Sequence, residues 1–141
     1  MNSVQIPWGA WYGDEAKILD FPSQANVRIA DIPYRPPLSS ESISDEFEQI
    51  SSLVSAKIPA SIVIVVDDLT RPLKMETVVN VLLDKLQTAG VEKDKIKILI
   101  GGGGHRPLSD EDVAKKLGRG VVENYPVFNH SPFRDLADLP L

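Results

Sequence analysis

The sequence predicts an α/β domain with a Rossmann-like parallel sheet and helices on its faces, preceded by a short N-terminal β-hairpin. Two apolar runs, Ser61–Val66 and Ile96–Ile100, are rich in β-branched residues, which is typical of strands buried on both faces of a parallel sheet. A segment with helical periodicity separates them, and a second helical segment precedes a third short strand at Tyr125–Asn129. This β-α-β-α-β order implies parallel strands joined by right-handed crossovers.

The N-terminal region contains the predicted hairpin and a connector. Val4–Ile6 and Ala16–Phe21 are predicted as its two strands, because Gly13-Asp14 between them suits a tight turn. An apolar alternation predicts a further, less regular strand over Asn26–Ile32. The proline-rich stretch Ile32–Leu38 then predicts a stiff connector.

Three helices are predicted from apolar periodicity and capping residues. The first begins at an N-cap at Ser42, with Asp45 three residues further on, and extends to about Ala56. The second carries its apolar residues on one face and has Gly90 as its C-cap; these residues are Met75, Val78, Val79, Leu82, Leu86 and Ala89. Ser109 caps the third, which ends near Gly118.

Length and composition limit the class of protein. A chain of 141 residues suits one domain, predicted here as an N-terminal part (1–59) followed by a βαβαβ core (60–141). Lys and Arg total 15 against 20 Asp and Glu, so binding to nucleic acid through many phosphates is not expected. No apolar run approaches the ~20 residues of a membrane span, and no secretory signal is visible, so we expect a cytoplasmic protein. The absence of cysteine excludes disulfides and thiolate sites.

Polar clusters follow each of the three predicted core strands. Asp67–Pro72 follows the first strand, Gly101–Pro107 the second, and Asn129–Ser131 the third. The carboxyl ends of parallel strands share one edge of the sheet, and ligands of open α/β sheets bind along that edge. The sequence therefore predicts that the three clusters converge on one crevice.

The second cluster begins with a run of four glycines that includes Gly103 and Gly104. Its backbone amides can cradle a phosphate or a carboxylate, although a merely mobile turn explains the run equally well. The run matches neither the P-loop pattern nor the dinucleotide fingerprint. Arg71 and Arg106 each precede a proline at a strand's exit, and a guanidinium binds carboxylate or phosphate with two parallel hydrogen bonds. We predict anion binding for both; the alternative is pairing with nearby aspartates.

His105 lies between the glycines and Arg106, and an imidazole there can act as a general acid or base. His130 is predicted to have a structural role. Thr70 can donate to a ligand oxygen or to the backbone of its own loop, and the sequence favours neither. Asp67 and Asp68 can bind a metal, orient a histidine or bind ribose hydroxyls.

These motifs resemble those of the N-terminal domain of the nickel-dependent lactate racemase family. The resemblance covers nearly the whole chain and rests on Asp68-Leu69-Thr70-Arg71-Pro72, Gly104-His105-Arg106-Pro107 and Asn129-His130. The family isomerises 2-hydroxy acids with a nickel pincer nucleotide, which takes a hydride from the carbinol carbon and returns it to the opposite face. The resemblance implies that His105 is one of two acid/base histidines. It also implies that Asp68 and Arg71 bind cofactor and substrate, with Arg71 on the substrate carboxylate.

Two departures from the family pattern affect the site. Gly104 stands where many members have Thr, and Ser131 stands where an Asp is usual. The family's cofactor-tethering lysine, nickel-binding histidine and second acid/base histidine lie in a C-terminal region that this sequence does not include. The resemblance thus implies about the first third of such an enzyme, inactive without a C-terminal domain or partner subunit that supplies those groups.

Two other functions fit the same residues. One is a stand-alone module that binds a nucleotide or a phosphorylated ligand. The other is a small hydrolase in which Asp67, Asp68, His105 and His130 surround a divalent ion.

Overall fold

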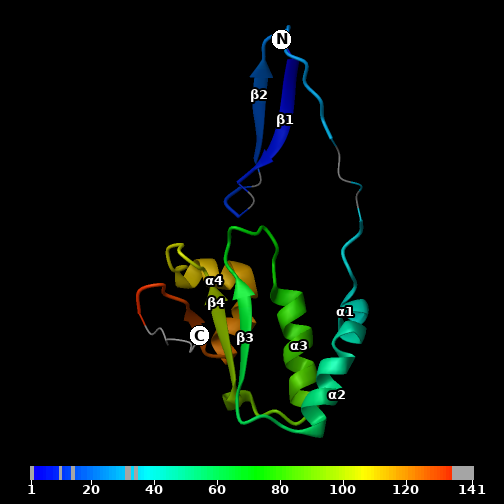
Figure 1. Ribbon diagram of the computed structural model, residues 1–141, viewed down its shortest axis with the longest axis vertical. Coiled ribbons are helices and arrows are strands. Elements are labelled where there is room, and N and C mark those ends of the chain that lie inside the picture. The colour runs from blue at the N-terminus through cyan, green and yellow to red at the C-terminus, as the bar shows by residue number, and fades with distance from the viewer. Residues whose placement is uncertain (1, 10, 14, 31–32, 34, 135–141) are drawn as a thin grey trace, which may run out of the picture. The chain divides into compact units, whose positions relative to one another are not determined.

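The computed structural model describes residues 2–9, 11–13, 15–30, 33 and 35–134 (Figure 1). The chain divides into two compact units, Met1–Pro37 and Leu38–Leu141, and each is considered by itself.

The first unit is the predicted antiparallel hairpin. Strand β1 (Asn2–Trp8) pairs with β2 (Glu15–Phe21) along their whole length. The Ser3 hydroxyl donates a 2.6 Å hydrogen bond to Asp20 across the pair. The strand predicted over Asn26–Ile32 is wrong for residues 26–30, which form no strand, while residues 31–32 lie outside the described part of the chain. Apolar alternation alone did not suffice there, because a strand also needs a partner for its backbone groups.

The second unit begins with two short helices, α1 (Ser40–Glu46) and α2 (Glu48–Ala56), where the sequence predicted one. Ser39, not Ser42, is the N-cap: it has extended backbone angles, and its hydroxyl accepts from the amide of Ser42 at 3.1 Å. The predicted cap therefore lies three residues inside the helix. The helical pattern is interrupted at Phe47, and both helices pack against α3.

The core of the second unit is a parallel three-stranded sheet in the order β3-β4-β5, as the sequence predicted. The strands are β3 (Ile62–Asp67), β4 (Ile96–Gly101) and β5 (Val127–Asn129). The connections contain α3 (Glu76–Thr88), the 3-10 turn η1 (Lys93–Lys95), α4 (Asp110–Leu117) and α5 (Arg119–Asn124). Ser109 caps α4 as predicted, and its hydroxyl accepts from the amide of Asp112 at 3.2 Å. No helix in the described ranges is long and apolar enough to cross a membrane.

The short helix α5 was not predicted. It starts directly after Gly118, which has a φ of +85°, a value that favours glycine. The sequence analysis assigned no element between the end of the preceding helix near Gly118 and the strand at Tyr125–Asn129.

Among the described residues of the second unit, one face of the sheet is buried and the other is largely open. Alternate strand residues such as Ile64, Ile98 and Ile100 lie in the core with side chains from α3, α4 and α5. On the opposite face, Val63 and Val65 are 54% and 65% exposed. The expectation of burial on both faces is therefore wrong here. The strands lie in the sheet in the same order as in the sequence, β3-β4-β5. Two right-handed crossovers that step in the same direction place their helices on the same side of the sheet.

Candidate functional site

The loops that follow the core strands meet at the carboxyl edge of the sheet. Asp67 at the end of β3 lies opposite Gly101 at the end of β4. Asn129 at the end of β5 lies opposite Ile100, and the next amide, that of His130, donates to the Ile100 carbonyl at 2.9 Å. The three polar clusters therefore start side by side at one edge of the sheet, as predicted, and the crevice expected between them stays a prediction.

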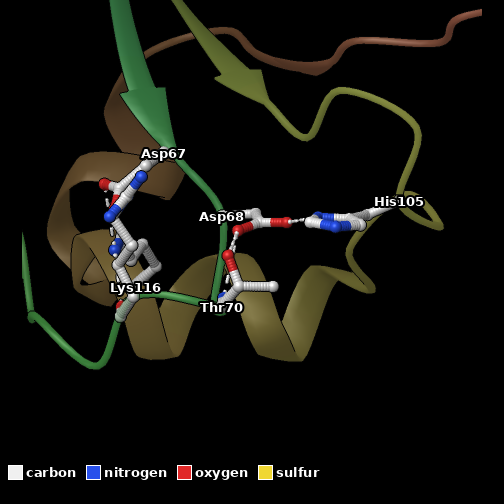
Figure 2. A network of polar contacts seen from close by, with 6 residues as sticks. Asp67, Asp68, Thr70, His105 and Lys116 are labelled. Atoms are coloured by element: carbon white, nitrogen blue, oxygen red, sulfur yellow. Dashed lines mark hydrogen bonds and ion pairs between the residues drawn. The ribbon is translucent and has the colours of Figure 1, made fainter.

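Asp68 and His105 form a carboxylate–imidazole pair at this edge. Nδ1 of His105 lies 2.6 Å from Oδ2 of Asp68 (Figure 2). The Asp68 residue is only 5% exposed, whereas the His105 side chain is 62% exposed. The pair therefore has a buried carboxylate and an imidazole that reaches solvent.

Thr70 holds the second oxygen of the same carboxylate. Its hydroxyl donates to Oδ1 of Asp68 at 2.5 Å, and its backbone amide donates to that oxygen at 3.0 Å. The amide contact is an Asx-turn, in which an aspartate side chain accepts from the amide two residues further on. The sequence left open donation to a ligand oxygen or to the loop's own backbone; in the structure the Thr70 hydroxyl donates instead to the side chain of Asp68.

These donors determine the charge of Asp68. They hold its pKa at about 2, below the ordinary 3.8. The Thr70 hydroxyl is the largest cause, burial opposes it, and the bond to His105 lowers the pKa further. Asp68 is therefore ionised at neutral pH and can only accept, so in the neutral imidazole Nδ1 of His105 carries the proton. The other nitrogen, Nε2, is then a lone-pair acceptor.

The glycine run forms a defined turn that carries His105. The amide of His105 donates to the carbonyl of Gly102 at 2.9 Å, and Gly103 within this turn has a φ of +55°. A Cβ atom placed on Gly102, Gly103 or Gly104 would meet no atom within 4 Å. Open space therefore adjoins the backbone of this loop, which is the condition for close approach of a ligand.

Asp67, adjacent to Asp68, belongs to a second polar network. Its Oδ1 lies 3.1 Å from Nζ of Lys116, and its Oδ2 lies 3.9 Å from Nε of Arg71. Figure 2 shows the two aspartates pointing in different directions, Asp67 toward Lys116 and Asp68 toward His105. The Arg71 side chain is 79% exposed, while that of Lys116 has no exposed surface.

Lys116 is the residue of this region that sequence reasoning missed. Charged residues dominate α4, and the sequence analysis assigned no role to any of its lysines. Helical spacing contained a signal, because position 116 lies three residues after the buried Val113 and next to the buried Leu117.

The other predicted site residues have different surroundings. Arg106 is exposed. Asn129 ties the end of β5 to the loop before α4, since its side chain accepts from the amide of Leu108 at 3.0 Å and donates to the carbonyl of Leu108 at 3.2 Å. Nδ1 of His130 is buried and has no hydrogen-bond partner among the described residues.

The residues suggested for a divalent ion are not gathered around one point. Asp67 contacts Lys116, whereas Asp68 contacts His105. Within the described ranges, no three His, Asp or Glu side chains are placed to hold a metal. The hydrolase alternative therefore has no set of ligands in this part of the chain.

The fold and the site define an α/β domain in which an ionised aspartate pairs with a histidine beside an open glycine loop, at the carboxyl edge of a parallel sheet. The family model of the lactate racemase N-terminal domain matches residues 12–139, so the chain belongs to that family. A lactate racemase of Lactiplantibacillus plantarum is 31% identical over 87 residues, which are 62% of this chain and 19% of that protein.

A solved structure agrees with this assignment. The lactate racemase apoprotein of Thermoanaerobacterium thermosaccharolyticum superposes with a TM-score of 0.58 at 27% identity, over 92% of this chain and 30% of that one. The chain therefore spans about a fifth to a third of the length of these relatives.

Proposed function

We propose that this chain is the domain of a lactate-type 2-hydroxyacid racemase or epimerase that supplies one acid/base histidine and an anion-binding loop. The pair between Asp68 and His105 is the observation that carries the proposal. Family membership supports it, because the relatives that the chain matches are lactate racemases.

In this proposal His105 moves the proton of the substrate hydroxyl. Its Nε2 accepts that proton from one enantiomer and returns it to the oxygen when the same enantiomer re-forms, while the bound cofactor would take up and give back the hydride. The ionised Asp68 stabilises the imidazolium that forms and keeps the imidazole in the required tautomer. Arg71 binds the substrate carboxylate through its exposed guanidinium.

The family resemblance implies a nickel pincer nucleotide, which would supply the hydride acceptor when bound. The open space beside Gly102–Gly104 fits a phosphate of such a nucleotide, and the exposed Arg106 adds a cation close by in sequence. The described residues provide no set of metal ligands.

The same open loop supports a second function, a module that binds a nucleotide or phosphorylated ligand without turning it over. The two functions differ in what they require of His105. A binding module holds its ligand equally well with alanine at that position.

The test is His105→Ala in an enzyme assembled from this chain and the C-terminal region of a related lactate racemase. We expect kcat to fall about 10²–10⁴-fold, as is usual for loss of a general acid/base, with a much smaller change in KM. Asp68→Asn, which removes the fixed tautomer, lowers kcat within the same range of about 10²–10⁴-fold. The control, Asp94→Asn, alters an exposed aspartate of η1 and leaves kcat unchanged. A kcat within tenfold of wild type for His105→Ala would show that this histidine is not the acid/base.

A further inference from the structure

Lys116 is a buried cation whose ammonium contacts the end of β3 and the loop that follows it. Lysine is almost never fully buried unless it is paired. Here the ammonium forms an ion pair with Asp67 at 3.1 Å and donates to the carbonyl of Arg71, also at 3.1 Å. The Lys116 carbonyl accepts from the amide of Met75 at 2.8 Å, so both backbone and side chain attach α4 to this segment.

Asp67 stands between two cations and interacts unequally with them. Its distance to Lys116 permits a hydrogen bond, but the 3.9 Å to Nε of Arg71 is too long for one. Charge interactions strengthen as distance and exposure decrease, and Lys116 is buried while Arg71 is largely exposed. The aspartate charge is therefore engaged mainly by Lys116.

This division of contacts matters for Arg71. A carboxylate four residues away on the same loop is a natural partner for an arginine, and a full pair would occupy the guanidinium and cancel its charge. An incoming anion would then have to displace Asp67. Because Lys116 holds Asp67, the guanidinium stays available to a ligand.

We propose that Lys116 is a positioning residue for anion binding, which holds the Asp67 carboxylate and so keeps the Arg71 guanidinium free for the carboxylate of the substrate. The inference rests on the proposed function, in which Arg71 binds that carboxylate. It adds a role for Lys116, which does not itself touch the ligand.

The experiment titrates the 141-residue chain with lactate and follows backbone amide resonances by NMR, which measures weak affinities. Lys116→Met frees Asp67 to pair with Arg71, and we expect lactate affinity to fall about tenfold, the order of a charge-assisted hydrogen bond. Lys115→Met is the matched control on the same helix. Lys115 pairs with Glu111 and Asp112, so its loss leaves the affinity unchanged.

A second substitution separates this role from a structural one. Asp67→Asn alone removes the competing charge and binds lactate at least as tightly as wild type. The Lys116→Met/Asp67→Asn variant then binds as tightly as Asp67→Asn, although the buried lysine is gone. Thermal unfolding and the amide spectra show which variants are folded. If Lys116→Met is unfolded, the inference is tested by comparing the lactate affinity of Asp67→Asn with that of the double variant. A double variant that binds clearly more weakly than Asp67→Asn would overturn the inference.

Arg71→Ala distinguishes failure of the inference from failure of the proposed function. If Arg71→Ala binds lactate like wild type, Arg71 is not the anion site, and the proposed function loses the residue that it assigns to the substrate carboxylate. If Arg71→Ala abolishes binding while folded Lys116→Met binds like wild type, the proposed site stands and the role of Lys116 is wrong.

Discussion

Asp68 uses each of its carboxylate oxygens for a different purpose. Oδ1 accepts from the hydroxyl and amide of Thr70, which fixes the carboxylate within its own loop. Oδ2 lies against Nδ1 of His105, which comes from a loop 37 residues away. The position and tautomer of the imidazole therefore depend on a bond between Asp68 and Thr70 that does not involve the imidazole. This makes Thr70 a positioning residue in the proposed site.

Thr70→Val tests that dependence, because it removes the hydroxyl and keeps the shape of the side chain. Since the hydroxyl is the largest cause of the low pKa of Asp68, we expect that pKa to rise from about 2 towards its ordinary 3.8. The measurement is the pH titration of the Asp68 carboxyl carbon by NMR. Thr70→Ser keeps a donor and is expected to titrate like wild type, and an unchanged titration in Thr70→Val would contradict the assignment.

The low pKa of Asp68 also predicts how stability depends on pH. A carboxyl whose pKa is lower in the folded than in the unfolded chain stabilises the fold when ionised. This contribution is complete above the ordinary value of 3.8 and is lost as the pH falls towards about 2. Urea unfolding across that range should therefore show a steeper loss of stability for wild type than for Asp68→Asn. Parallel curves for the two proteins would count against the lowered pKa.

At the scale of elements, sequence predicted what local chemistry determines. The three core strands, the hairpin and the Ser109 cap depend on residue type and short-range spacing, and all were predicted. Which face of the sheet is buried depends on the side on which the crossover helices lie. An uninterrupted apolar run such as Ser61–Val66 does not show which of its residues will face those helices. Lys116 was missed for a similar reason: its partner Asp67 is 49 residues away, and only the tertiary fold brings the two charges together.

The one-sided sheet predicts unequal effects of similar substitutions in the 141-residue chain. Ile98 has no exposed surface, so Ile98→Ala should lower the free energy of unfolding by about 2–5 kcal/mol. Val65→Ala, on the open face, should change it by no more than about 0.5 kcal/mol. Urea denaturation of both variants measures the difference. A large cost for Val65→Ala would indicate that this face is covered in solution.

At the scale of the whole molecule, the described residues form one side of the candidate site and leave its functional groups open to solvent. The described residues combine an exposed imidazole, an exposed guanidinium and an open glycine loop, all at the edge of one sheet. The relatives are three to five times longer than the region that matches this chain. Charge interactions are weak where water reaches them and strengthen when a site is enclosed. A complete racemase site in our proposal therefore requires polypeptide on the other side of the ligand.

This one-sidedness leads to the expectation that the 141-residue chain alone binds lactate weakly and does not racemise it. Racemisation requires proton chemistry at both faces of the carbinol carbon, and the proposed site provides one histidine. It also requires a hydride acceptor, and neither imidazole nor carboxylate can accept a hydride, so this step belongs to a cofactor. The assay incubates the chain with one lactate enantiomer and preformed nickel pincer nucleotide, then measures the optical composition, with an intact lactate racemase as the positive control. Racemisation by the chain alone would mean that it contains catalytic groups that we have assigned to another part of the enzyme.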